Sequence, residues 1–227
     1  MIAALARLPA ARLTRSVRGA LAVGGWTALT FAIACLARSR GAAHGADHVL
    51  IGAYAPVVLP LLAYGIVGIA VGSRSLSAAI APLVSFGASP TRAAAVTVAI
   101  AVTACAAAGA ILASAIALLA HGVADPPRLG DALRSGYAGA LGGGAYGALF
   151  SLGSNFGRRG GGRTVLLACD WVLGANAGAL ALLTPRAHLR SLLGGLPPMA
   201  WSEQASAAAL VVLTTIGCAL AIRRAQG

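Results

Sequence analysis

The sequence predicts an all-α integral membrane protein with six membrane-spanning helices. Hydrophobic residues make up 59% of the 227 residues and charged residues only 10%, whereas soluble domains carry about 25% charged residues. Six long apolar stretches are separated by short segments that contain arginine or turn-forming residues. Most are long enough for a helix to cross a hydrocarbon core about 30 Å thick, where a helix satisfies its own backbone hydrogen bonds. The predicted spans cover residues 19–36, 49–71, 93–120, 136–152, 165–183 and 205–222 of a single transmembrane domain.

The distribution of arginine predicts the orientation of these spans. All 17 basic residues are arginine, and the net charge is +12. Eleven arginines fall at the two termini and in the second and fourth loops, and four of the five acidic residues fall on the arginine-poor side. Because positively charged loops stay inside, we expect a multi-pass protein of the bacterial cytoplasmic (inner) membrane with both termini cytoplasmic. The arginines are clustered between apolar spans, so membrane lipids are the expected partners and nucleic acid is not.

Residues 1–18 precede the first span and predict an amphipathic helix. At about 100° per residue, Arg7, Arg15 and Arg18 fall within one arc of the helix. Arg12 lies at the edge of that arc, and apolar residues occupy most of the opposite side. We expect this helix to lie in the headgroup plane with its arginines toward phosphate groups; a plain positive anchor is the alternative.

The second span contains Pro56 and Pro60, which should free backbone carbonyls and bend the helix, so that it either lines a cavity or only packs. The loop from Ser73 to Arg92 predicts one or two short cytoplasmic helices. Its apolar residues recur at helical spacing, until Gly87 begins a turn: Leu76, Ala79, Ile80, Leu83 and Val84. A simple connector does not need an apolar face, so we expect this face to lie on lipid or on another protein.

Glycines dominate the fourth span. Gly139, Gly143 and Gly147 recur every four residues, and Gly174 and Gly178 repeat the spacing in the fifth span. Small residues at this spacing let helix backbones approach closely. We therefore expect tight helix–helix contacts, within the subunit or across a dimer.

The segment 185–201 between the fifth and sixth spans is more apolar than a solvated loop. It combines prolines and glycines with four leucines and ends at Trp201. In membrane proteins, tryptophan is enriched at the level of the lipid headgroups. This composition predicts a short re-entrant or interfacial helix.

The motifs of this sequence do not predict an enzyme, and we expect the chain to bind no metal and no cofactor. A G-x-G-x-x-G pattern at 142–147 lies inside an apolar span, not after a strand. A pattern close to a P-loop at 157–164 has Arg163 in place of the phosphate-binding lysine. Neither a zinc-protease H-E-x-x-H motif nor a pair of acids within the spans occurs in the sequence. The four cysteines lie one each in four spans and are expected to be structural.

Asp170 is the one acidic residue within a predicted span. A carboxylate inside the membrane is costly and is usually paired. Arg163 or an arginine of a neighbouring helix is a candidate partner. Both a structural ion pair and a transport role stay open for Asp170; Asn155 and Asn176 are weaker candidates of the same kind.

Two passages carry a resemblance to a known family. Residues 83–92 read LVSFGASPTR, and residues 148–152 read ALFSL before Arg158 and Arg159 lead into the fifth span. Together with the order of the predicted elements, they resemble the permease subunits of type-2 ATP-binding-cassette (ABC) exporters. That family has an N-terminal amphipathic helix, six spans, a cytoplasmic coupling helix between spans two and three, and re-entrant helices between spans five and six. The family usually places acidic residues in the coupling loop, and this chain has none there.

The resemblance implies a permease of an ABC exporter, without an ATPase module of its own. ATP would be used by a separate ABC ATPase subunit, and a second permease subunit would complete a homo- or heterodimer. The apolar spans favour a hydrophobic or amphiphilic substrate. The residues implied in ATPase coupling are Arg74, Leu83, Phe86, Ser89, Pro90 and Arg92. A non-transporting membrane scaffold, or an accessory subunit of a larger membrane complex, is the alternative.

Overall fold

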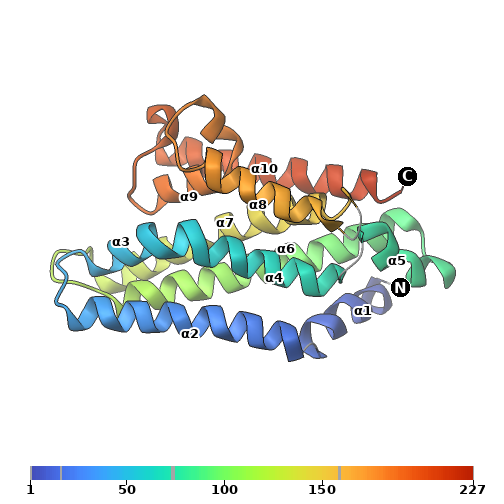
Figure 1. Ribbon diagram of the computed structural model, residues 1–227, viewed down its shortest axis with the longest axis horizontal. Helices are drawn as coiled ribbons and strands as arrows, with labels where there is room; N and C mark the ends of the chain where they lie inside the picture. Colours follow the sequence, from blue (N-terminus) through green and yellow to red (C-terminus); the bar gives the residue numbers. More distant parts are fainter. Residues whose placement is uncertain (1, 16, 73–74, 158–159, 227) are drawn as a thin grey trace.

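The computed structural model describes residues 2–15, 17–72, 75–157 and 160–226, and all regular structure in these ranges is helical. The elements are α1 (Ile2–Arg15), α2 (Val17–Ser39), α3 (Gly45–Val49), the π-helix η1 (Leu50–Val58), α4 (Leu59–Val71), α5 (Leu76–Ser85), α6 (Pro90–Leu119), α7 (Arg128–Gly153), α8 (Gly162–Leu173), the 3₁₀ helix η3 (Ala179–Leu183), α9 (Pro185–Leu192), the 3₁₀ helix η4 (Pro198–Ala200) and α10 (Glu203–Arg224). The long helices run along one axis, and both chain ends lie at the same end of it, next to α1 and α5 (Figure 1).

Helix α7 is the centre of the bundle. It packs against α4 and α6 on one side and against α8, α9 and α10 on the other, while α2 covers α4 and α6 (Figure 1). Most residues of its C-terminal half are buried, including Tyr146 and Phe150, whose rings stack at 5.7 Å. The other long helices therefore meet around a chain segment that is rich in glycine.

The outer surface of the bundle is apolar. Within the described residues, three helical stretches are long and apolar enough to span a membrane: one within Gly45–Ser85, Pro90–Leu119 and Glu203–Arg224. Large apolar side chains such as Phe31 on α2 and Ile216 on α10 are exposed. Apolar exposure on this scale is unfavourable in water and favourable in lipid. The fold thus confirms the class that the sequence predicts, an all-helical membrane-embedded protein.

The second predicted span is helical throughout but is not a regular α-helix. Pro56 lacks an N–H, and the backbone widens into the π-helix η1 around it. The N–H of Leu59 binds the carbonyl of Tyr54, five residues earlier, as a π-helix requires. Pro60 lies two residues after η1, within the same continuous helix, and it too supplies no N–H to the helical hydrogen bonding. The two prolines are accommodated by local widening of the helix.

The predicted fifth span, 165–183, is not one continuous helix, and this prediction needs correction. Helix α8 ends at Leu173, and the chain turns before the short 3₁₀ helix η3. Two arginines of α9 replace the helical hydrogen bonds that are lost: Arg186 donates to the carbonyl of Trp171 at 3.0 Å, and Arg190 to that of Ala175 at 3.2 Å. An average of hydropathy along the sequence does not reveal which side chains will bind the carbonyls at a helix end.

Helix α9 folds back against the bundle. It packs on α7 and α10 and buries one face, including His188, whose Nε2 lies 2.9 Å from the carbonyl oxygen of Leu182. Burial lowers the pKa of this imidazole, so the neutral form is favoured. The His188 ring also packs against Trp201 at 5.7 Å. The segment between the fifth and sixth helical regions is therefore a folded part of the core and not a solvated loop.

Candidate functional site

The segment implied in ATPase coupling begins with a well-capped short helix. The hydroxyl of Ser75 accepts a hydrogen bond from the N–H of Ala78 and caps the N-terminus of α5. At the other end, Gly87 has a φ of +86°, and the N–H of Ala88 binds the carbonyl of Leu83 at 3.1 Å. This Schellman motif requires a left-handed residue, which glycine adopts without strain. The chain therefore turns sharply after Phe86.

The apolar stripe of α5 does not face lipid or a partner, contrary to the sequence-based expectation. Leu76, Ala79 and Ile80 are at most 5% exposed, and Leu83 and Val84 pack partly buried against the core. The helix lies on α6 at the end of the bundle where both termini are found (Figure 1). The stripe is used for packing within the chain, since the bundle itself offers an apolar surface at this end.

Residues 85–92 follow the apolar stripe in the sequence and form a short exposed surface. We call these residues the exposed turn. Phe86 is 91% exposed, and Ser89, Pro90 and Arg92 are exposed as well. Four of the six residues implied in coupling therefore gather on this turn. Leu83 does not belong to it, and Arg74 lies outside the described residues.

Two arginines hold the C-terminal end of α4. The guanidinium of Arg12 on α1 donates to the carbonyls of Ala70 on α4 and Ala79 on α5, both at 3.3 Å. Arg163 donates to the carbonyl of Gly72, also at 3.3 Å, and its guanidinium lies 5.7 Å from the ring of Tyr64. Cations at a helix C-terminus satisfy its free carbonyls and oppose its dipole. Arg12 was expected to face lipid phosphates, but it is half-buried and binds backbone carbonyls of α4 and α5 instead.

Replacing Arg12 by alanine is expected to loosen α5. The variant loses both hydrogen bonds that connect α1 to the ends of α4 and α5, so amide hydrogen exchange in residues 75–85 should accelerate several-fold. Arg7 is exposed on the same helix, and its replacement by alanine should leave the exchange unchanged. Hydrogen-exchange mass spectrometry of the purified protein measures both. Equal exchange in the two variants would contradict the role of Arg12.

Asp170 is buried and does not pair with Arg163, whereas Arg186, an arginine of the neighbouring helix α9, contacts it through its backbone N–H. Its carboxylate is 2% exposed and accepts a hydrogen bond from the hydroxyl of Tyr146 at 2.7 Å. The backbone N–H of Arg186 donates to the other oxygen at 3.3 Å. Arg163, the partner considered from the sequence, binds the carbonyls of Gly160 and Gly72 instead. The network connects α7, α8 and the start of α9, an arrangement that fixes the broken fifth segment in place.

Neither asparagine contacts Asp170 through a hydrogen bond that the structure describes. The amide of Asn155 donates to the carbonyl of Ala221 on α10 at 3.1 Å. Asn176 is exposed and donates to the carbonyl of Val172, one turn earlier in its own segment. Asn155 therefore connects the turn after α7 to α10, whereas Asn176 acts within its own segment.

The glycine stripe of α7 faces α6. A Cβ added at Gly139 would lie 2.8 Å from the carbonyl carbon of Gly109, and one at Gly147 would lie 3.0 Å from the Cα of Val102. A Cβ added at Gly174 would be equally close to its neighbours, 2.9 Å from the Cβ of Arg186. Around Gly178, by contrast, no described atom lies within 4 Å of such a Cβ, so the expected packing role does not hold there. The close contacts lie within one chain.

Four of the five acidic residues gather at the end of the bundle opposite the termini. Asp47, Asp131 and Glu203 line one opening of about 190 Å³ together with Arg134, which forms an ion pair with Glu203. Asp125 lies beside Asp47 across His44. Burial raises the pKa of Asp131, and the neighbouring charges of Asp47 and Asp125 raise it further. This end therefore holds most of the acidic residues of a chain that is strongly positive.

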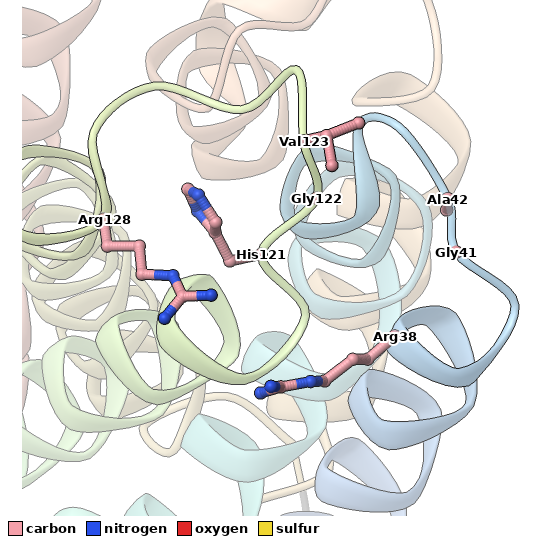
Figure 2. A pocket seen from close by; sticks show the side chains of 7 residues that line it. All are labelled: Arg38, Gly41, Ala42, His121, Gly122, Val123 and Arg128. Atoms are coloured by element: carbon pink, nitrogen blue, oxygen red, sulfur yellow. The ribbon is translucent and has the colours of Figure 1, made fainter.

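A second opening, of about 400 Å³, lies next to these acids. Figure 2 shows Arg38, His121 and Arg128 along its wall, on the end of α2, in the loop after α6 and at the start of α7. The Nδ1 atom of His121 is buried without a hydrogen-bond partner in the described part of the chain. Guanidinium groups bind phosphate and carboxylate through paired N–H donors, so this opening favours an anionic group. Arg38 lies far from His121 and Arg128 in the sequence, and only the fold brings the three residues together.

The fold and these surfaces define an α-helical membrane protein with a polar, charged end opposite its two termini. Comparisons of the chain with models of known protein families, with curated proteins and with solved structures found no match.

Proposed function

We propose that this chain is the permease subunit of an ABC-type exporter of the bacterial inner membrane. It would move a hydrophobic or amphiphilic substrate with ATP that a separate ATPase subunit hydrolyses, and a second permease subunit would complete the transporter. In this proposal both termini and the exposed turn face the cytoplasm. The acidic end and the opening of Figure 2 face outward.

The observation that carries the proposal is the position of Phe86. It is a large apolar side chain, 91% exposed, on a rigid turn between the second and third long helical segments. The turn lies at the same end as both termini, beside the arginine-bearing α1 (Figure 1). An aromatic side chain that projects from a well-capped turn suits a pocket of a partner protein, because aromatic anchors dominate such contacts. The exposed turn is therefore the surface on which we place the ATPase.

Helix α5 can transmit motion from that surface to the bundle. Its buried stripe packs on α6, and Arg12 connects it to the end of α4. A push on the exposed turn would thus act on α4 and α6 together. Packed helices respond as rigid elements with discrete arrangements, which is what a coupling element needs.

Replacing Phe86 by aspartate should abolish association with the ATPase subunit. The chain is purified from its native membranes, and the recovered P-loop ATPase is identified by mass spectrometry and by ATP hydrolysis. We expect at least a tenfold loss of recovered ATPase activity, since an aspartate in an apolar pocket is strongly unfavourable. Leu196 is 74% exposed in the segment between α9 and η4, and its replacement by aspartate is the matched control that should retain the ATPase.

A non-transporting membrane scaffold is the second candidate function. It is favoured by the burial of the α5 stripe, which leaves a smaller docking surface than the sequence indicated. The same experiment separates the two functions. Recovery of no ATPase with the wild-type chain, or equal recovery with the Phe86 and Leu196 variants, would contradict the proposed permease.

A further inference from the structure

Two loops meet at the end of the bundle opposite the termini. One follows α2 and leads into α3, and the other connects α6 to α7. The N–H of Ala124 binds the carbonyl of Ala43 at 3.0 Å. A Cβ added at Gly122 would clash with the carbonyls of Ala42 and Ala43, so only glycine allows this approach. The backbone of the two loops is therefore fixed by direct contact before any side chain is considered.

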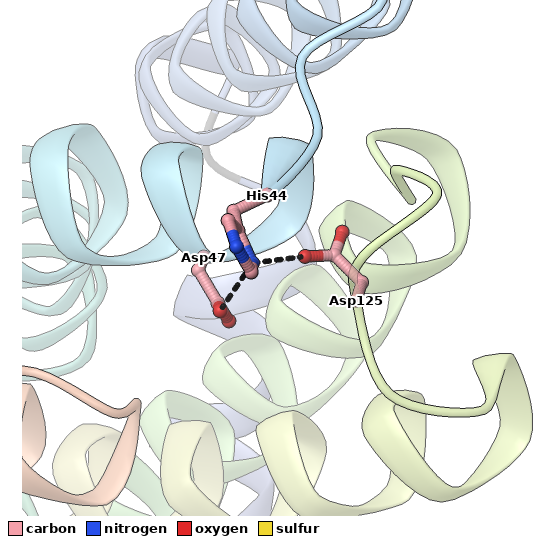
Figure 3. A group of neighbouring side chains, drawn as sticks. All are labelled: His44, Asp47 and Asp125. Atoms are coloured by element: carbon pink, nitrogen blue, oxygen red, sulfur yellow. Dashed lines mark ion pairs between the residues drawn. The ribbon is translucent and has the colours of Figure 1, made fainter.

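Three potential metal-ligand side chains converge where the loops meet. The Nδ1 atom of His44 lies 3.7 Å from Oδ1 of Asp125 and 4.0 Å from Oδ2 of Asp47 (Figure 3). One potential ligand atom from each residue lies within 4.8 Å of the other two. His44 and Asp47 come from the first loop and the start of α3, and Asp125 comes from the second loop.

Asp125 is oriented by backbone hydrogen bonds. Its side chain is 0% exposed, and its Oδ2 accepts hydrogen bonds from the N–H of Gly122 at 2.7 Å and of Ala46 at 3.0 Å. Its Oδ1 is buried, faces His44 and has no hydrogen-bond partner within the described part of the chain. Leaving a buried carboxylate oxygen without a partner is costly. A bound cation would satisfy this atom.

The three groups lie at ion-pair distances but are too far apart for hydrogen bonds between them. A charge-assisted hydrogen bond between imidazole and carboxylate would be about 2.7–2.9 Å long, and both separations from His44 exceed this by most of an ångström or more. Ligands of a tetrahedral zinc ion lie about 3.3 Å from one another when the metal–ligand distances are about 2.0–2.1 Å. The two separations from His44, 3.7 and 4.0 Å, exceed that value, so the three side chains would move closer together when they bind the ion.

We propose that His44, Asp47 and Asp125 bind one divalent transition-metal ion, with Zn²⁺ the best fit. One imidazole nitrogen and two carboxylate oxygens are a ligand set that suits Zn²⁺ better than Mg²⁺, which prefers oxygen ligands and water. The His44 side chain is 65% exposed, which gives the ion a path from the aqueous side and leaves a coordination position for water. The ion would clamp the loop after α2 to the loop after α6. This proposal does not depend on the permease function.

Zn²⁺ binding to the purified full-length protein tests the proposal. The protein is prepared without a histidine tag in detergent at pH 7.5, stripped with a chelator, and titrated with Zn²⁺ by calorimetry. We expect one ion per chain and a higher melting temperature in its presence. Replacement of His44 by alanine, or of Asp47 by asparagine, should weaken binding at least about tenfold.

Replacement of His48 by alanine is the matched control. His48 is exposed, lies four residues from His44 and is not part of the cluster. This variant should bind Zn²⁺ like the wild type. Because His44 is mostly exposed, its variant should melt like the wild type when metal is absent, which separates loss of the ion from loss of the fold. Absence of Zn²⁺ binding by the wild type, unchanged binding by the His44 and Asp47 variants, or equally tight binding of Mg²⁺ would overturn the assignment.

Discussion

Replacement of Gly143 by alanine is expected to destabilise the protein by about 3 kcal/mol, the upper part of the range for an overpacked core. An added Cβ at Gly143 would lie 2.9 Å from the carbonyl carbon of Cys105 and 3.2 Å from the Cα of Ala106. Both atoms belong to the backbone of α6, which cannot move aside as a side chain can. The two most extensively packed helices, α6 and α7, would have to separate. Equilibrium unfolding in mixed micelles, followed by circular dichroism, measures the free energy.

The neighbouring glycine provides a matched control. A Cβ at Gly144 would meet its nearest atoms, on Thr214 and Ala106, at 3.9–4.0 Å, which is ordinary van der Waals contact. The change of Gly144 to alanine should therefore cost nothing and stabilise the helix by up to about 1 kcal/mol. Similar unfolding free energies for the two variants would show that the α6–α7 contact is not as tight as the structure places it.

Replacement of Tyr146 by phenylalanine is expected to cost about 2 kcal/mol, because it leaves one oxygen of Asp170 buried without a partner. Tyr146 is 0% exposed, and its hydroxyl is the hydrogen-bond donor to that oxygen at 2.7 Å. The loss should be measured by the same unfolding experiment. It should also accelerate hydrogen exchange in α8 and α9, which Asp170 connects through the N–H of Arg186.

Tyr137 offers the control for this change. It lies on the same helix but is 58% exposed, so its replacement by phenylalanine should alter the unfolding free energy by less than about 0.5 kcal/mol. A stability loss confined to Tyr146 would assign Asp170 a structural role in holding the broken fifth segment. Wild-type stability of the Tyr146 variant would contradict that role.

The helical regions were predictable where length and hydropathy decide them. The predicted spans 19–36, 93–120 and 205–222 each lie within a few residues of α2, α6 and α10. These helices bury one face and expose apolar side chains on the other, so an average over the sequence identifies them. The glycine stripe of α7 was also visible, because close helix contact needs small residues at four-residue spacing whatever the partner is.

The fifth predicted span shows a feature that length and hydropathy do not predict. Hydropathy extends a span from residue 165 to 183, yet the helix stops at Leu173. At the break, Arg186 and Arg190 of α9 bind the carbonyls of Trp171, in the last turn of α8, and of Ala175, just after it. No local feature of the segment reveals side chains that arrive from a later helix. For the same reason the partner of Asp170 could not be found, since Tyr146 lies 24 residues away.

The sequence by itself determined that this is an all-helical membrane protein, because backbone hydrogen bonding in lipid leaves a long apolar stretch few alternatives to a helix. It also indicated the short helix before the third long segment, from its apolar periodicity. Only the tertiary structure decided that the stripe of α5 is buried while Phe86 is exposed. Only the fold brought His44 and Asp47 to Asp125, about eighty residues away in the chain. Which surfaces stay free, and which distant polar groups meet, depends on how the helices pack, and sequence periodicity does not specify that.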